Sequence, residues 1–360
     1  MPVLSDVARQ ADVSLATASR ALDPDNDHPV HESTRARVQA AAQLLSYRPN
    51  PMARALRTRR VPTIAIVVHD VSDPYFAEVV RGATGAASAR GFLTVVCNSA
   101  RDPQTELRYV EMLCLSRASG VIFAGGGLEE AHYRRAMNGY ARSIAGYGGA
   151  LVALAPRAER WPSELPDNRS GARLATEHLL GLGHVNIATI GGPTTLRTSR
   201  ERELGYAEAM KSAGLKPHIV PADFTPAGGA RAMAALVAGR SPTAVFVASD
   251  TMALGVLAEL RRRGIRVPED VSVAGFDDIP GLEFIHPNLT TVRVPMAELG
   301  AAGVRRLLGE LDGEPHGARV NLHPVELVVR ESTGPLSRRL PPSKRVDGLP
   351  AEAPVRRNHH

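Results

Sequence analysis

The chain of 360 residues has little cysteine and no long apolar run, and both absences narrow its class. Its two cysteines, Cys97 and Cys114, stand in apolar surroundings without the CxxC spacing of a redox or metal site. We expect them to be small buried side chains in a protein of the reducing cytoplasm. The sequence contains no run of about eighteen apolar residues, which is the length that a membrane-spanning helix needs. The N-terminus lacks the basic-then-apolar order of a signal peptide, so export is not expected.

Motifs of common enzyme classes are also missing. The triplet Gly125-Gly126-Gly127 is not a phosphate-binding loop, because no Gly-Lys-Ser/Thr follows it. No GxGxxG opens a helix after the first predicted strand, and neither a GxSxG elbow nor an HExxH motif occurs. The twelve histidines are scattered along the chain. We therefore expect no catalytic residue, no metal site and no cofactor.

Charge is distributed unevenly along a chain with a net charge of +6. Residues 1–60 contain nine arginines against six acidic residues, and residues 335–360 contain six basic residues against two acidic ones. The region between them is close to neutral. A basic head on a near-neutral body favours a polyanionic partner for the head. The tail carries many prolines and charges, and we expect it to be disordered.

The pattern of apolar residues and prolines along the sequence predicts a helical head and an α/β body. Residues 1–48 are expected to form helices near 6–11, 14–22 and 32–46, and prolines punctuate residues 49–60. From Thr63 onward, strands rich in valine, isoleucine and alanine alternate with helices. This pattern predicts parallel sheets covered on both faces, in two lobes broken near residues 156–168. The segment 139–161 is expected to be irregular.

The first two predicted helices have the layout of a helix-turn-helix, with Ser14 placed to cap the second. In that motif the second helix enters the major groove with its N-terminal residues on base edges. Leu15 and Ala16 would contact thymine methyl groups, and Arg20 could reach guanine O6 and N7. Spacing alone leaves a plain helical hairpin about equally open. The net positive charge of residues 1–60 favours DNA.

A series of short motifs runs through the chain in a fixed order. They are Asp6-Val7-Ala8, Val13-Ser14, Tyr47-Arg48-Pro49-Asn50, Ser72-Asp73-Pro74-Tyr75-Phe76, Arg200-Glu201-Arg202, Ser249-Asp250-Thr251-Met252-Ala253, Gly275-Phe276-Asp277-Asp278 and Leu289-Thr290-Thr291-Val292. With these motifs, over about residues 3–334, the chain resembles the LacI/GalR family of bacterial transcriptional regulators.

The resemblance implies which residues contact DNA. Residues 49–60 would hold a hinge helix that folds only when two copies meet on the operator, and the weak helicity expected of so short a segment agrees. Leu56 would wedge into the central base step from the minor groove, although an ordinary linker residue is the alternative. The implied DNA-binding set is Ser14, Leu15, Ala16, Thr17, Arg20, Asn50, Ala53, Arg54 and Leu56.

The resemblance also implies a body similar to periplasmic sugar-binding proteins, with a small ligand held between two lobes. The implied effector-binding set is Asp73, Tyr75 and Phe76 from lobe one, and Arg202, Phe224, Ser249, Asp250 and Asp277 from lobe two. The arginine fork and the carboxylate of Asp277 suit a polyhydroxylated or heteroaromatic ligand. Asp250 could equally cap the helix after Ser249, and Phe224 could serve packing alone.

Three positions depart from the family pattern. Asp12 stands where glycine is usual in the first turn, and we expect aspartate to tolerate the left-handed backbone there. His31 replaces a common serine or threonine cap, which loosens the start of the third helix. Ser249 replaces a common asparagine, so sugar-type contacts at that position are uncertain.

We therefore predict a cytoplasmic repressor that binds a near-palindromic double-stranded operator as a homodimer and responds to a small-molecule effector. The expected domains are the head 1–48, the hinge 49–60, the effector and dimerisation domain 61–334 and the tail 335–360. Within 61–334, lobe one is expected at about 61–160 plus 293–322 and lobe two at about 161–292 plus 323–334. Pro341-Pro342 interrupts the C-terminal leucines, which favours a dimer over a tetramer. The alternatives are a small-ligand-binding protein and an α/β enzyme with an accessory helical domain.

Overall fold

The computed structural model describes residues 2–23, 29–47, 61–128, 130–157, 161–239, 241–314 and 318–336. The chain divides into two compact units. The first unit comprises Met1–Asn168, Thr194–Glu201 and Val294–Val325, and the second comprises Arg169–Pro193, Arg202–Arg293 and Glu326–His360. Since the chain passes between the units several times, each unit is assembled from segments that are distant in sequence.

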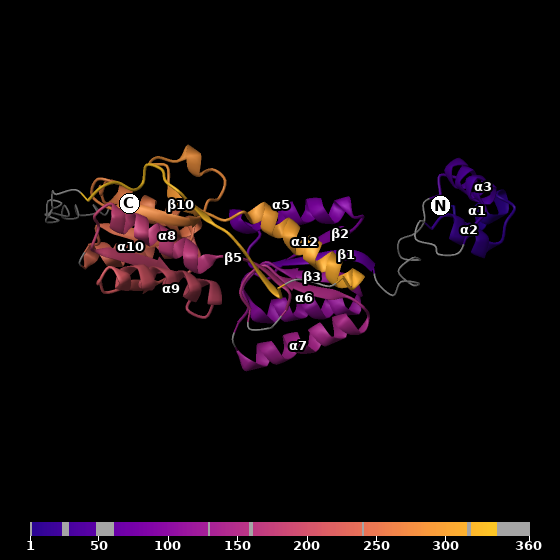
Figure 1. The fold of residues 1–360 in the computed structure, drawn as a ribbon, viewed down its shortest axis with the longest axis horizontal. Helices are drawn as coiled ribbons and strands as arrows, with labels where there is room; N and C mark the ends of the chain where they lie inside the picture. The colour runs from indigo at the N-terminus through magenta and orange to yellow at the C-terminus, as the bar shows by residue number, and fades with distance from the viewer. Residues whose placement is uncertain are drawn as a thin grey trace, which may run out of the picture. The chain divides into compact units, whose positions relative to one another are not determined.

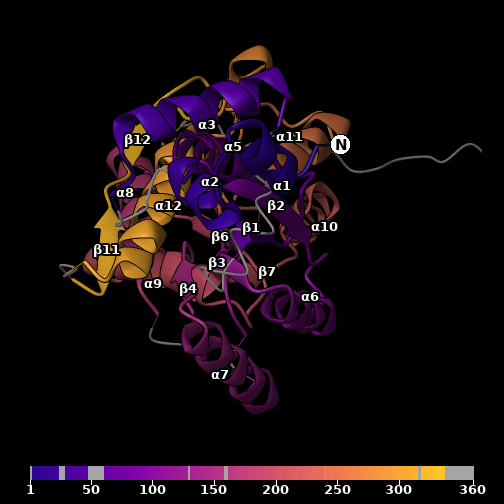
Figure 2. The ribbon, with the colours of Figure 1, turned by 90° about the vertical axis from the view of Figure 1, so that its right-hand side faces the viewer.

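Three helices at the N-terminus pack around a small core of their own (Figures 1 and 2). They are α1 (Leu4–Gln10), α2 (Leu15–Ala21) and α3 (Glu32–Leu44). Ser14 is the N-cap of α2, and its Oγ accepts a hydrogen bond from the Thr17 amide at 3.1 Å. Asp12 has a φ of +49°, which confirms that aspartate takes the left-handed turn here. His31 is the N-cap of α3 but makes no capping hydrogen bond.

Alanine dominates this core, so the three helices approach one another closely. Val7 and Val38 are fully buried, and the small side chains around them are also buried. The buried alanines are Ala8, Ala11, Ala18, Ala21, Ala41 and Ala42. Because these residues recur at helical spacing, the opposite face of each helix is left to solvent and to partners.

The rest of the first unit is built on a parallel sheet of six strands, in the order β11-β5-β4-β3-β1-β2. The strands are β1 (Val61–Val68), β2 (Leu93–Asn98), β3 (Ala118–Phe123), β4 (Ala150–Ala153), β5 (Ser163–Pro166) and β11 (Val320–His323). Its helices are α5 (Pro74–Ala89), α6 (Pro103–Leu115), α7 (Ala131–Gly146) and α12 (Met296–Asp312). Figure 1 shows α5 and α12 on one face of this sheet, with α6 and α7 on the other.

Glycine allows α5 and α12 to lie against each other. A Cβ added at Gly82 would lie 1.8 Å from the carbonyl oxygen of Ala297, and one at Gly300 would lie 2.0 Å from that of Val79. Since both clashes are with backbone, no side-chain movement could relieve them. The pair of helices therefore depends on these two glycines.

The second unit is built on another sheet of six strands, in the order β12-β10-β9-β8-β6-β7. The strands are β6 (Ile187–Gly191), β7 (Ile219–Pro221), β8 (Ala244–Val247), β9 (Ser272–Asp277), β10 (Thr290–Arg293) and β12 (Glu326–Val328). Its helices are α8 (Asn168–Gly181), the part of α9 (Arg197–Ser212) from Arg202 onward, α10 (Pro226–Ala238), α11 (Asp250–Arg262) and the short 3₁₀ helix η1 (Leu282–Phe284). The predicted α/β class with parallel sheets is confirmed, except that β12 runs antiparallel to β10.

One prediction about the body is wrong. The segment 139–161, which we expected to be irregular, contains the second half of α7 and all of β4. Glycines mislead here because they stand inside or beside regular elements: no atom lies within 4 Å of a Cβ added at Gly139 or Gly146. The helix α7 therefore tolerates glycine at these two positions and continues through them.

Candidate DNA-binding and effector sites

Helix α2 exposes the side chains that the sequence predicts to reach base edges. Leu15 is 54% exposed although it is a large apolar residue, and Ala16 and Arg20 are also exposed. The hydroxyl groups of Ser14 and Thr17 are 2.8 Å apart and hydrogen-bond each other beside the cap. An exposed leucine beside an exposed arginine at this helix leaves both side chains accessible to the base edges of a major groove.

The predicted hinge residues cannot be placed in the same way. Asn50, Ala53, Arg54 and Leu56 lie outside the described residues. Their roles therefore stay predictions.

In the second unit, Arg202 and Asp277 form a buried ion pair at the carboxyl end of β9. The distance between Arg202 Nη2 and Asp277 Oδ1 is 3.1 Å, and the two side chains are 5% and 7% exposed. The guanidinium carbon of Arg202 lies 3.8 Å from the centre of the Phe276 ring, and Arg202 Nη1 donates to the carbonyl of Ala248. A planar donor held against an aromatic face is thus fixed in place beside a carboxylate at a strand end.

The Asp250 carboxylate, at the start of α11, accepts hydrogen bonds from the protein itself. Ser249 is the N-cap of α11, because its Oγ accepts from the Met252 amide at 3.3 Å, so the capping alternative for Asp250 is wrong. Asp250 is buried beneath β9. Its Oδ1 accepts from the Thr291 hydroxyl at 2.6 Å, and its Oδ2 accepts from the Asp278 amide at 2.6 Å.

The pKa of Asp250 is raised well above its ordinary value, first by burial and second by the negative charge of Asp277. Gly275 makes room for this carboxyl group, since a Cβ added there would lie 2.1 Å from Asp250 Oδ1. Asp250 therefore holds the strand end and the loop that carry Asp277. The same arrangement leaves Ser249 buried at the helix start.

The aromatic residue predicted for this unit lies at the edge of its core. Phe224 is half-buried and packs against the hydrophobic cluster of the second unit. This position is compatible with the packing alternative as well as with a contact to a ligand.

In the first unit, the residues after β1 form the start of α5. Asp73 is the N-cap, and its Oδ1 accepts from the Tyr75 amide at 3.1 Å. The Tyr75 and Phe76 rings meet edge to face, with centres 5.2 Å apart and planes at 86°. Phe76 is buried and Tyr75 is partly exposed. The motif is thus folded as a capped helix start with Tyr75 on its accessible side.

A buried cluster at the carboxyl ends of β1, β3 and β4 was not predicted. Arg157 Nη2 lies 2.8 Å from Glu106 Oε1, Arg157 also bonds the Tyr133 hydroxyl, and its Nη1 donates to the Gly125 carbonyl at 3.0 Å. Phe123 adds a ring 4.3 Å from the guanidinium carbon. No sequence motif joins these residues; the only available signal was that Arg157 follows a buried strand.

His69, the residue directly after β1, is buried near the same cluster. Burial is the main cause that lowers the pKa of His69 to about 4, and nearby Arg101 and Arg157 lower it further, against a rise caused by Glu106. Its ring meets Phe76 edge to face at 5.8 Å. The imidazole is therefore neutral at pH 7. Its position at a strand end was a signal that the sequence offered.

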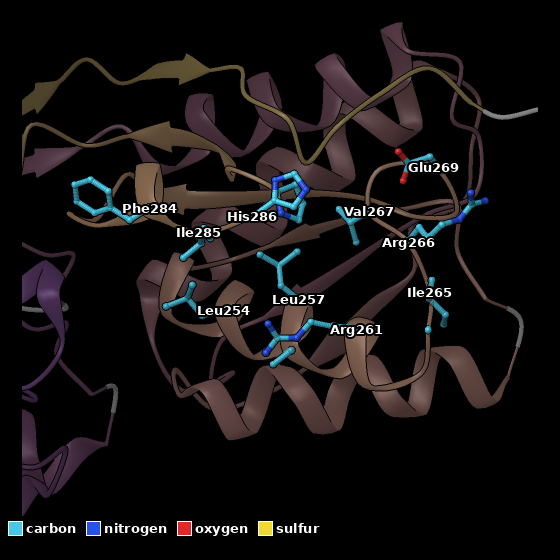
Figure 3. A pocket seen from close by; sticks show the side chains of 13 residues that line it. Leu254, Leu257, Arg261, Ile265, Arg266, Val267, Glu269, Phe284, Ile285 and His286 are labelled. Atoms are coloured by element: carbon cyan, nitrogen blue, oxygen red, sulfur yellow. The ribbon is translucent and has the colours of Figure 1, made fainter.

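A hollow of about 740 Å³ lies in the second unit (Figure 3), and the residues that line it do not include the predicted effector residues. Apolar side chains from α11 and from the segment around η1 line it together with Arg261, Arg266, Glu269 and His286. Phe284 is 85% exposed and the His286 side chain is 90% exposed. An exposed phenylalanine beside a hollow with a mixed polar and apolar lining makes this face a candidate surface for a protein partner.

Neither a metal site nor a membrane span is found in the described part of the chain. Within those residues, no group of three or more histidine, cysteine, aspartate or glutamate side chains is placed to hold a metal ion. Likewise, no helix of the described ranges combines the length and the apolar character needed to cross a bilayer.

Comparison with known proteins places the chain in a family. The model of bacterial regulatory proteins of the lacI family matches residues 3–50, and that of the periplasmic binding protein-like domain matches residues 176–333. The HTH-type transcriptional repressor CytR of Escherichia coli (strain K12) is 35% identical over 336 residues, which are 92% of this chain and 96% of CytR.

Solved structures of transcriptional regulators are also similar to this chain. The Lac repressor dimer bound to operator and the anti-inducer ONPF is 27% identical with a TM-score of 0.80, over 92% of this chain and 99% of that one. The transcriptional regulator CelR in complex with cellobiose is 31% identical with a TM-score of 0.67, over 92% of this chain and 100% of that one. The chain therefore belongs to the LacI family. It is a ligand-regulated, DNA-binding transcriptional repressor and not an enzyme.

Proposed function

We propose that this repressor works in the cytoplasm as a homodimer whose two heads, residues 1–48, bind the half-sites of a near-palindromic operator. Two-fold symmetry in the protein requires the same symmetry in the DNA. The exposed Leu15, Ala16 and Arg20 on α2 are the observation that carries this proposal. Residues 49–60 act as the hinge, residues 61–334 bind effector and partner, and residues 335–360 form a tail.

Two exposed apolar surfaces support dimerisation through the body. In the first unit, the edge strand β2 leaves Leu93 66% exposed, with Val95 and Val96 beside it. An uncovered apolar edge strand is a hazard for a protein that stays alone in solution. In the second unit, the hollow near Phe284 is the corresponding surface. We assign both surfaces to the contact with a second copy.

The effector is proposed to bind to Arg202 and Asp277 of the second unit. A guanidinium fork and a carboxylate recognise hydroxyl groups or ring nitrogens, so a sugar or a related metabolite fits this pair. Cellobiose in the CelR complex and ribose in a LacI-family regulator of Enterococcus faecium support this class. The ligand can act only through different affinities for two states of the protein.

A thermal-shift panel of sugars, nucleosides and related metabolites on the full chain tests the effector assignment. A ligand that binds the folded state raises the melting temperature. We expect one class to do so, and expect Asp277→Ala to abolish the shift while the dimer persists. A shift of undiminished size in Asp277→Ala would place the effector elsewhere. A gel shift of the full chain against residues 61–360 separately tests the role of the head.

A further inference from the structure

One carboxylate of the second unit, adjacent to the effector pair, binds two arginines. Asp278 Oδ2 accepts from Arg293 Nε at 2.7 Å, and its Oδ1 accepts from Arg330 Nη2 at 2.7 Å. The Asp278 side chain is only 9% exposed. A buried carboxylate shared by two guanidinium groups is a fixed point of the structure, since moving it would break two charge-assisted hydrogen bonds.

One of these arginines, Arg293, ends the strand on which the chain leaves the second unit, and the other, Arg330, follows the strand on which the chain returns. Arg293 ends β10 and is the last residue of the second unit before the chain continues in the first, and Glu326 is the first residue after its return. Arg293 Nη1 lies 2.6 Å from Glu326 Oε1, opposite it in the antiparallel pair of β10 and β12. Arg330 also donates to the Leu289 carbonyl at 2.8 Å, just before β10.

The effector pair is connected to a third crossing. Arg202, the partner of Asp277, is the first residue of the second unit after the segment Thr194–Glu201 of the first unit. The Asp277 carboxylate contacts Arg202, and the carboxylate of the adjacent Asp278 contacts Arg293 and Arg330. These three arginines lie at or near three points where the chain passes from one unit to the other. All the contacts lie inside the second unit.

The backbone of this turn is constrained as well. Asp277 has a φ of +118° and Asp278 a φ of +59°, in the region that non-glycine residues rarely adopt. Asp250 Oδ2 accepts from the amides of Asp278 at 2.6 Å and of Ile279 at 3.2 Å, which holds the turn in this conformation. The turn therefore cannot shift at Asp277 without moving the Asp278 carboxylate.

We propose that Asp278 is a positioning residue of the effector site. It fixes the turn that presents Asp277 to Arg202, and it ties the position of that turn to the crossing strands β10 and β12. A ligand that draws Asp277 away from Arg202 loosens these two strands through Asp278. The proposal rests on the proposed function only in taking Arg202 and Asp277 as the effector pair.

A double-mutant cycle on the full chain, read by hydrogen exchange, tests this coupling without any effector. Asp277→Asn removes the charge that holds Arg202 and stands in for the ligand, and Asp278→Asn removes the link to the strands. We expect Asp277→Asn alone to speed exchange in peptides covering β10 and β12 by about tenfold, and by less than about twofold in the Asp278→Asn background. The peptide covering β6 is the internal control.

A merely structural role for Asp278 would give additive effects in the cycle, and additivity would overturn the proposal. Asp270→Asn serves as the matched control, because Asp270 also pairs with an arginine, Arg266, at 2.8 Å, in the segment that follows α11 and not at β10 or β12. Its cycle with Asp277→Asn should be additive. If Asp278→Asn does not fold, Arg330→Gln cuts one arm of the same link and the same criterion applies. The thermal-shift panel reports separately whether Asp277 binds an effector.

Discussion

Replacing Asp277 with alanine should destabilise the second unit, because it leaves Arg202 buried without its carboxylate partner. Removing one partner of a buried ion pair costs about 3–5 kcal/mol. Arg202 keeps the Ala248 carbonyl and the face of the Phe276 ring, so we expect the lower end, about 3 kcal/mol. For a body of this size that loss lowers the melting temperature by about 6–12 °C.

Scanning calorimetry of the full chain measures this change, with the double variant Arg202→Met/Asp277→Ala as the decisive comparison. Replacing a whole buried ion pair by apolar side chains is often neutral, so the double variant should recover most of the lost stability. Asp223→Ala is the control, because its pair with Arg231 is exposed and should contribute at most about 1 kcal/mol. If the double variant were as unstable as the single one, the ion pair would not be the cause.

The remaining predictions concern DNA contacts and pH. Arg20→Ala should weaken specific operator binding by about 1–3 kcal/mol and relax base preference at one position; an equal loss on all duplexes in a gel-shift series would make Arg20 a phosphate contact instead. Leu56→Ala should reduce operator bending, measured by the mobility of permuted duplexes, with the body still folded; unchanged bending would refute the wedge. His69 has a pKa of about 4 in the fold against an ordinary 6.5, so the unfolded chain binds more protons between these values. The free energy of unfolding should therefore fall as pH is lowered from about 6.5 towards 4, by up to about 1.4 kcal/mol per pH unit, and stay constant above this range with respect to His69. His69→Gln should lessen that slope in urea titrations, and an unchanged slope would exclude His69 as its source.

The head and the central strands could be predicted from sequence because each depends on local patterns. Ser14 in front of a short segment with apolar residues at helical spacing is enough to predict the N-cap of α2. An uninterrupted run of apolar residues, such as residues 64–68, is enough to predict a buried strand. Aspartate at position 12 could be judged from backbone preference alone. Such features need no knowledge of what lies opposite them in the fold.

Helix α10 (Pro226–Ala238) shows why local sequence preference does not predict every element of the body. It begins Pro-Ala-Gly-Gly, which is unfavourable for an isolated helix. In the fold, a Cβ at Gly228 would lie 2.5 Å from the Asp223 carbonyl oxygen, and one at Gly229 would lie 2.2 Å from that of Met252. The glycines are required by the close approach of backbone, so tertiary packing overrides local propensity here.

The effector pair was predicted by resemblance, but the residues that hold it in place were not. Asp278, Arg293 and Arg330 come together only because β10 and β12 pair across a long excursion of the chain through the first unit. Arg157 and Glu106 are likewise 51 residues apart in sequence. No spacing rule connects such residues, because their proximity is a consequence of strand order.

Selection from a pool of random duplexes by the purified full chain tests the central claim most directly. We expect enrichment of one near-palindromic sequence with two symmetric half-sites, and a change in its affinity when a metabolite that stabilises the protein is added. Enrichment of no sequence at all, with or without such metabolites, would contradict the account.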